Sequence, residues 1–171
     1  MKIRDMALCG LFAAILAICA WISVPVLEIA FTMQTFGVAL CLCLLGGKRG
    51  TLCITVYLLL GLVGAPVFSG FRGGVGALLG ATGGYTIGFL LFGLVYWLTA
   101  GKIPEAVALA LGMLACYGVG TAWFYWVYLQ GGNAVGIGTV LIKCVLPYLL
   151  PDAAKLSLAL ILAGRLKKRV Y

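Results

Sequence analysis

The last hydrophobic stretch of the chain, LPYLLPDAAKLSLALIL at 146–162, contains an acidic and a basic residue, Asp152 and Lys155. At this spacing two helical residues share a face, so a carboxylate that accepts hydrogen bonds stands beside an ammonium that donates them. A charged side chain in the middle of a bilayer costs about 3 kcal/mol on insertion scales, so the pair indicates a functional site. The alternative is a self-neutralising ion pair that braces a helix bundle.

Two prolines, Pro147 and Pro151, precede this pair and favour an interrupted helix. Proline breaks a helix interior but suits a first turn, so we expect a break at Pro147 and a half-helix that begins near Asp152. Ten residues separate Lys155 from Arg165, which puts Lys155 about 15 Å above the cytoplasmic end of the helix. Interrupted helices at membrane depth are typical of transporter binding sites.

The composition is that of an integral membrane protein. Hydrophobic residues make up 64% of the 171 residues and charged residues 9%, whereas soluble domains average about 25% charged residues. The length accommodates about six spans of roughly 20 residues, so we expect one membrane domain over 1–171. The net charge of +8 does not indicate nucleic-acid binding, because most basic residues lie between or beyond the hydrophobic stretches, where they orient a membrane protein.

An all-α bundle of six transmembrane helices is predicted, at 6–25, 31–47, 51–66, 80–100, 105–129 and 137–164. Basic residues lie at both chain ends and in alternate loops: Lys2, Arg4, Lys48, Arg49, Lys102, Arg165, Lys167, Lys168 and Arg169. By the positive-inside rule both termini are cytoplasmic, as an even number of spans requires. The opposite loops carry only Glu28 and Arg72 as charges.

The segment GAPVFSGFRGGVGALLGATGG, at 64–84, is rich in glycine. It is too irregular to cross lipid as an exposed segment, because its backbone polar groups would lack partners. We therefore expect it to line or cover a protein-enclosed pocket. Arg72 within it either binds a ligand carboxylate or faces solvent. The polar residues Gln34 and Thr35 enter the top of the second predicted span.

Small residues form faces on two predicted helices. Gly10, Ala13, Ala14 and Ala17 lie on the first, and glycines 76, 80, 84 and 88 recur every fourth residue later in the chain. Such faces allow close helix approach. Packing within the bundle is one interpretation of each, and contact with a partner helix or a ligand is the other.

Several kinds of site are disfavoured. The chain has no histidine, the commonest general base and metal ligand. Its seven cysteines all lie in hydrophobic stretches and are expected to be packing residues. Gly46-Gly47-Lys48-Arg49 lacks the glycine spacing and the Ser/Thr of a P-loop. We therefore expect no metal or cofactor in this chain, and any ATP-driven step must come from another chain.

Three ordered motifs resemble those of the BioY family, the biotin-specific substrate-binding (S) components of energy-coupling factor (ECF) vitamin transporters. They are MQT at 33–35, GLVGAPVFSGFRGGVGALLGATGGYTIGF at 61–89 and PYLLPDAAK at 147–155. The chain differs from the family pattern at Ala81, where proline is common, and at Pro151, where glycine often precedes the aspartate. These differences affect only local loop geometry.

The resemblance implies a six-helix S component of a prokaryotic plasma membrane, which captures biotin and joins a membrane coupling protein and two cytoplasmic ATPases that use ATP. The 64–84 segment would form a lid. The expected substrate-binding residues are Asp152, Lys155, Tyr85, Arg72, Gln34, Gly83 and Gly84. The expected surface for the coupling protein is the face with Ala13 and Ala17, together with Gly10 and Ala14.

Three alternatives remain open at the level of sequence. The chain could be an S component for another small vitamin. It could be a membrane hydrolase or transferase that uses Asp152, although Asp5, Glu28 and Glu105 are the only other carboxylates. It could also be a scaffold that only binds membrane partners, in which case Asp152→Asn should leave its function intact.

Overall fold

The computed structural model describes residues 3–24, 29–131 and 136–170. Lys2 and Glu28, which entered the topology prediction, lie outside these ranges. The helices are α1 (Ile3–Trp21), α2 (Gln34–Leu62), α3 (Val75–Leu79), α4 (Gly83–Thr99), α5 (Glu105–Gln130), α6 (Ile137–Cys144) and α7 (Leu146–Val170). A 3₁₀ turn, η1 (Ser69–Phe71), precedes α3, and two short strands, β1 (Ser23–Val24) and β2 (Phe31–Thr32), pair antiparallel after α1.

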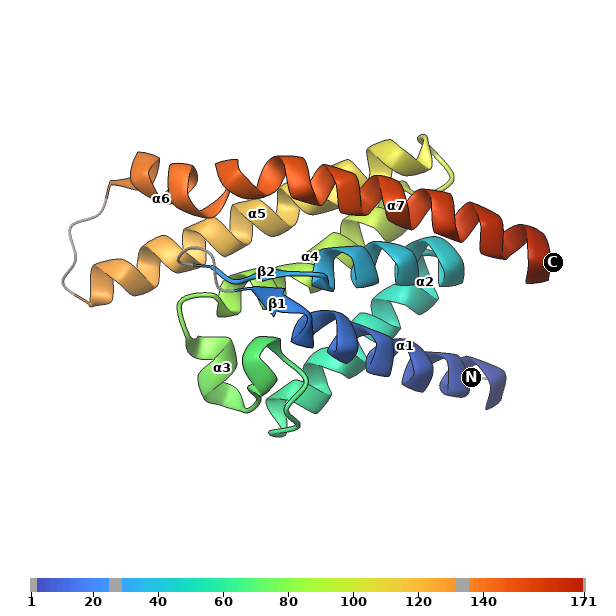
Figure 1. Ribbon diagram of the computed structural model, residues 1–171, viewed down its shortest axis with the longest axis horizontal. Helices are drawn as coiled ribbons and strands as arrows, with labels where there is room; N and C mark the ends of the chain where they lie inside the picture. Colours follow the sequence, from blue (N-terminus) through green and yellow to red (C-terminus); the bar gives the residue numbers. More distant parts are fainter. Residues whose placement is uncertain (1–2, 25–28, 132–135, 171) are drawn as a thin grey trace.

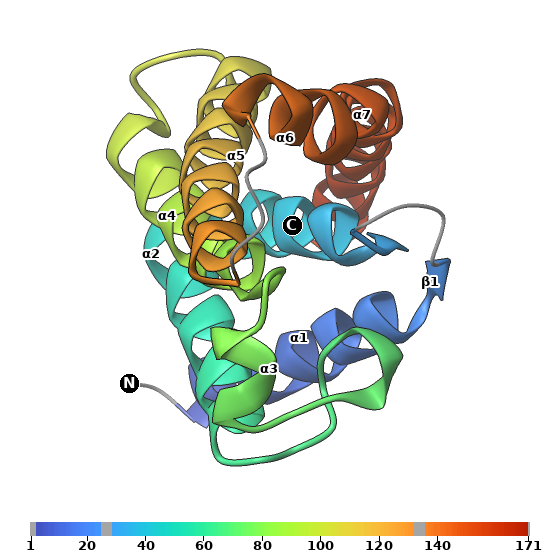
Figure 2. The ribbon, with the colours of Figure 1, turned by 90° about the vertical axis from the view of Figure 1, so that its left-hand side faces the viewer.

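The predicted helical membrane architecture is confirmed in its main features. Within the described ranges, four helical stretches are long and apolar enough to cross a membrane, namely α1, α2, α5 and the run formed by α6 and α7. The helix α4 is apolar but shorter. Both chain ends lie at the same end of the molecule (Figure 1). Seen from the opposite end, α5, α6 and α7 lie on one side, α1 and α3 on the other, and the start of α2 between them (Figure 2).

The helix α2, from 34 to 62, covers most of two predicted segments, 31–47 and 51–66. Gly46, near the end of the first segment, has φ 78° and ψ 167° and interrupts the helical backbone. Glycine adopts a positive φ readily because it has no Cβ. The chain changes direction there, at the end of the molecule where the termini lie (Figure 1).

The last predicted segment is interrupted, but not where we expected the half-helix to start. The break falls at Val145, between α6 and α7, with φ −121° and ψ −55°. Pro147 therefore stands in the first turn of α7, where its missing N–H costs no hydrogen bond. Pro151 lies inside α7, so a helix start near Asp152 is wrong. Either proline suits a first turn, and the sequence alone did not distinguish them.

Glycines bring α4 and α5 into close contact. A Cβ added at Gly88 would lie 2.9 Å from the Cys116 sulfur, and one at Gly84 would lie 2.2 Å from Cβ of Trp123. Gly76 belongs to the separate helix α3, so the four-residue repeat of glycines is not one continuous ridge. Helix packing therefore accounts for the two glycines of α4. All seven cysteines are buried as well.

The small-residue face of α1 requires a correction. Ala13 and Ala17 are only 3% and 5% exposed, and they lie in the core that α1 shares with α2. Gly10 and Ala14 are exposed. The two pairs form adjacent rows at four-residue spacing, and only one row can face away from the bundle. Ala13 and Ala17 are therefore not available on the outer surface for a partner.

Candidate ligand-binding site

A cavity of about 250 Å³ lies among the start of α2, the glycine-rich segment, α4, α5 and α7. The polar residues in its wall include Thr32, Gln34, Thr35, Ser69, Arg72, Tyr85, Tyr117, Tyr148, Asp152 and Lys155. Its apolar residues include Ile29, Phe68, Phe89 and Met113. A concave wall that combines apolar side chains with converging polar groups is typical of small-molecule sites. The prediction that the 64–84 segment lines a pocket is confirmed.

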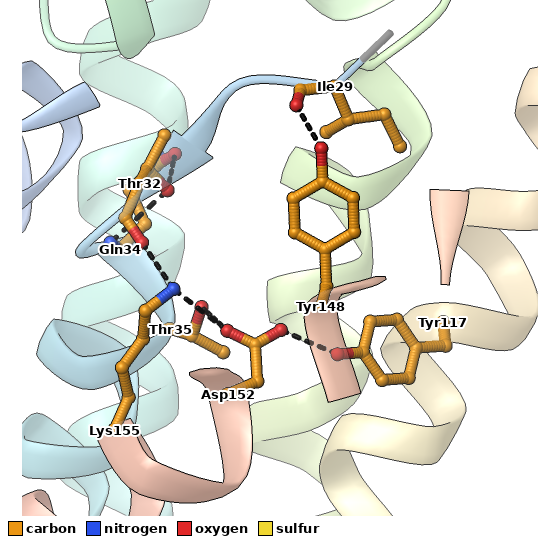
Figure 3. Close-up of polar contacts among 8 residues, drawn as sticks. All are labelled: Ile29, Thr32, Gln34, Thr35, Tyr117, Tyr148, Asp152 and Lys155. Carbon is orange, nitrogen blue, oxygen red and sulfur yellow. Dashed lines mark hydrogen bonds and ion pairs between the residues drawn. The ribbon is translucent and has the colours of Figure 1, made fainter. Parts of the chain in front are cut away.

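Asp152 is 5% exposed and accepts hydrogen bonds from three side chains. Its Oδ1 accepts from Oγ1 of Thr35 at 3.1 Å and from Nζ of Lys155 at 2.9 Å, and its Oδ2 accepts from the hydroxyl of Tyr117 at 2.5 Å (Figure 3). A buried carboxylate is tolerated when it is paired and hydrogen-bonded in this way. The carboxylate thereby connects α7 to α2 and α5.

Lys155 is 6% exposed and has its own set of contacts. Its Nζ donates to the Thr32 carbonyl oxygen at 2.6 Å, besides its bond to Asp152 (Figure 3). It also lies 3.8 Å from the centroid of the Phe31 ring, in a cation–π contact. The ammonium therefore fixes β2 and the start of α2 against α7.

The sequence left two interpretations of the Asp152–Lys155 pair, a functional site and an ion pair that braces the bundle, and the geometry is compatible with both. The contacts brace the bundle, and both side chains also line the cavity. An ionised carboxylate has about four lone-pair positions. Three of them are used by the protein donors of Asp152, which leaves acceptor capacity for a donor group in the cavity.

Gln34, Tyr85 and Arg72 also line the cavity. Gln34 donates through Nε2 to the hydroxyl of Tyr57 at 2.8 Å. The hydroxyl of Tyr85 lies 3.2 Å from Oγ1 of Thr121. Arg72 is exposed, and its Nε donates to the Ser69 carbonyl oxygen at 3.2 Å. Arg72 therefore faces solvent and also lines the cavity, and its binding to a ligand carboxylate stays a prediction.

Gly83 and Gly84, which were predicted as substrate-binding, are not in the cavity wall. A Cβ at Gly83 would lie 1.7 Å from the Leu78 carbonyl oxygen, and Gly84 packs on Trp123. Both glycines therefore permit close packing around the start of α4. In the GGY sequence, Tyr85 is the residue that reaches the cavity.

Sequence reasoning did not identify Tyr117 and Tyr148 as site residues. Tyr148 precedes Asp152 by one helical turn, which puts them on one face of α7, and this spacing could have revealed it. Its hydroxyl donates to the Ile29 carbonyl oxygen (Figure 3). Tyr117 lies far from Asp152 in sequence, and its only signal was a polar group in the middle of an apolar helix.

Comparisons with known proteins identify the family of the chain. The family model described as "BioY family" matches residues 1–171. A probable biotin transporter BioY of Pyrococcus horikoshii is 38% identical over 167 residues, which cover 98% of each chain. The biotin transporter BioY of Thermotoga maritima is 38% identical over 172 residues, which cover 96% of each.

A solved structure has the same fold. It is a crystal structure of the S-component for biotin from an ECF-type ABC transporter, with a TM-score of 0.84 and 25% sequence identity. The match covers 98% of this chain and 92% of the other. The matched family, the two full-length relatives and the fold agree, and the chain belongs to the BioY family.

Proposed function

We propose that this chain is the biotin-binding S component of an ECF transporter and acts in the plasma membrane of a prokaryote. The observation that carries the proposal is the cavity in which the buried pair of Asp152 and Lys155 meets aromatic and aliphatic walls. Relatives that match nearly the whole chain are named biotin transporters, which supports the same ligand.

The chemistry of biotin matches this cavity. Biotin offers two ureido N–H donors, a carbonyl acceptor, an apolar fused ring with a thioether, and a carboxylate. The remaining acceptor position of Asp152 suits a ureido N–H, and Lys155 donates to a ligand oxygen. Phe89 and Met113 suit the ring and the thioether. Arg72 supplies guanidinium donors to the ligand carboxylate.

We further propose six membrane passes, formed by α1, the two halves of α2, α4, α5 and the α6–α7 run, with both termini cytoplasmic. The proposal is supported by the common position of the termini and the turn at Gly46 (Figure 1). Basic residues lie near both turns on this side: Lys48 and Arg49 follow Gly46, and Lys102 lies in the connection between α4 and α5. Basic loops are typical of the cytoplasmic face of a membrane protein.

Uptake would require partner chains. We propose a membrane coupling protein and two ATPases as these partners, with ATP used by the ATPases alone. We propose that the docking surface on α1 consists of the exposed residues Gly10 and Ala14, without the buried Ala13 and Ala17. A partner helix can approach closely at such small residues. An enzymatic role has less support, because Asp152 is the only carboxylate in the cavity wall among the described residues.

Vitamin selectivity tests the proposed ligand. The purified chain is titrated with radiolabelled biotin in detergent, and riboflavin and thiamine are added as competitors. Saturable biotin binding that neither competitor displaces is the expected result. Binding of riboflavin or thiamine in place of biotin would show an S component for a different vitamin.

A further inference from the structure

The residues from Pro66 to Arg72 form a loop over the cavity, and this loop is attached to the bundle at two places. The first attachment is on α2. Phe68 is 5% exposed and meets the Tyr57 ring edge-on at 5.6 Å between centroids. The hydroxyl of Tyr57 donates to the Val67 carbonyl oxygen at 3.0 Å. Phe68 lines the cavity, so this attachment belongs to the site already described.

The second attachment is Trp21, the last residue of α1. Its indole Nε1 donates to the Pro66 carbonyl oxygen at 2.8 Å. Its ring stacks on Phe71 with 4.9 Å between centroids and an interplanar angle of 27°. Trp21 itself is absent from the cavity wall, and it is 38% exposed. Its contacts are therefore made to the loop rather than to a ligand.

The backbone of Phe71 has an unusual conformation, which the stacking contact with Trp21 helps to hold. Among the described residues it is the only non-glycine with a positive φ, 56°. A bulky residue in this conformation is strained and persists where neighbouring groups hold it. Phe71 is 64% exposed, and its ring stacks on Trp21. The next residue, Arg72, faces the cavity.

We propose that Trp21 is a positioning residue that holds the 66–72 loop closed over the cavity and thereby limits the rates of ligand binding and release. The inference rests on the proposed function only for the identity of the ligand. Without the indole, the loop keeps its attachment at Phe68 but loses those at Pro66 and Phe71. The half of the loop that carries Arg72 is then released from α1 and is still held by the Phe68 N–H, which donates to the Arg72 carbonyl oxygen at 2.9 Å, and by the chain that follows.

Two measurements test this role. In the first, hydrogen–deuterium exchange of residues 64–74 is compared without ligand in wild type and Trp21→Ala, and faster exchange is expected in the variant. In the second, dissociation of labelled biotin is followed after an excess of unlabelled biotin is added. From one aromatic stacking contact and one hydrogen bond, we expect dissociation to be about tenfold faster. Association should also become faster, so the affinity should fall less than the dissociation rate rises.

Three further variants sharpen the test. Trp21→Phe keeps a stacking ring without the N–H and should give an intermediate dissociation rate. Phe71→Gly removes the ring and accommodates the positive φ, so it should release the loop without straining the fold. Combining it with Trp21→Ala should add less than the two single effects together. Trp97→Ala is the matched control, since Trp97 is 45% exposed and packs beside Gly47.

Unchanged loop exchange together with unchanged biotin dissociation in both Trp21→Ala and Phe71→Gly would overturn the proposal. Equal effects from Trp97→Ala would also overturn it, because the effect would then be a general loss of stability. If wild type binds no biotin, the proposed function fails, and the exchange of residues 64–74 still decides whether Trp21 holds the loop.

Discussion

Replacing Asp152 by asparagine separates the two roles of the buried pair. The change keeps the side-chain shape but removes the charge opposite Lys155, which is 6% exposed and has few other partners. Removing one partner of a buried ion pair costs about 3–5 kcal/mol. The asparagine oxygen can still accept from Thr35 and Lys155, so we expect a loss of about 2–3 kcal/mol in the free energy of unfolding.

Biotin affinity should fall further than stability alone would require. A charge-assisted hydrogen bond contributes about 1.5–3 kcal/mol, which corresponds to a decrease in affinity of roughly 10–100-fold. The assays are thermal unfolding of the purified variant in detergent and equilibrium binding of tritiated biotin. Asp5→Asn is the control, because the Asp5–Arg49 pair lies 3.3 Å apart with 57% of the arginine and 17% of the aspartate side chain exposed, against 7% and 8% for Lys155 and Asp152. Such a surface pair contributes about 0–1 kcal/mol.

The double variant Asp152→Asn/Lys155→Met tests whether the pair binds the ligand or only braces the bundle. Replacing both charges of a buried pair by neutral groups of similar size is often neutral for stability. We therefore expect the double variant to regain much of its stability while it still binds biotin weakly. A double variant that is stable and binds biotin as tightly as wild type would show that the pair only braces the bundle.

Three further predictions concern the surroundings of the pair, the α4–α5 contact and the surface of α1. Tyr117→Phe removes one donor to the carboxylate and should weaken biotin binding by roughly fivefold in the same equilibrium assay, as expected for about 1 kcal/mol. Gly88→Leu should destabilise the fold by about 1–3 kcal/mol or more in thermal unfolding, because its Cβ would lie 2.9 Å from the Cys116 sulfur. Ala14→Leu should keep biotin binding but reduce co-purification with the coupling module, and unchanged co-purification would count against the reduced docking surface.

The sequence was most informative where charge and backbone chemistry stand out against an apolar background. Asp152 and Lys155 were recognisable because ionisable groups are costly in a membrane. The 64–84 segment was recognisable because irregular backbone must be enclosed by protein. Both predictions depend on the type of residue and on its surroundings in sequence, and neither requires knowledge of a distant contact.

The features that sequence did not reveal depend on tertiary packing. The bond from Tyr117 to Asp152 joins α5 to α7, and no spacing rule relates them. The burial of Ala13 depends on which row of α1 faces α2, and two adjacent rows carried similar residues. The start of α7 depends on where the backbone turns at Val145, which neither proline specifies alone.

A crystal structure of this chain with biotin tests the central claim most directly. We predict that biotin occupies the cavity, with one of its polar atoms within about 3 Å of the Asp152 carboxylate or the Lys155 ammonium and its fused ring against Phe89 and Met113. Biotin bound at a different place, with this cavity empty and the pair unchanged, would contradict the account.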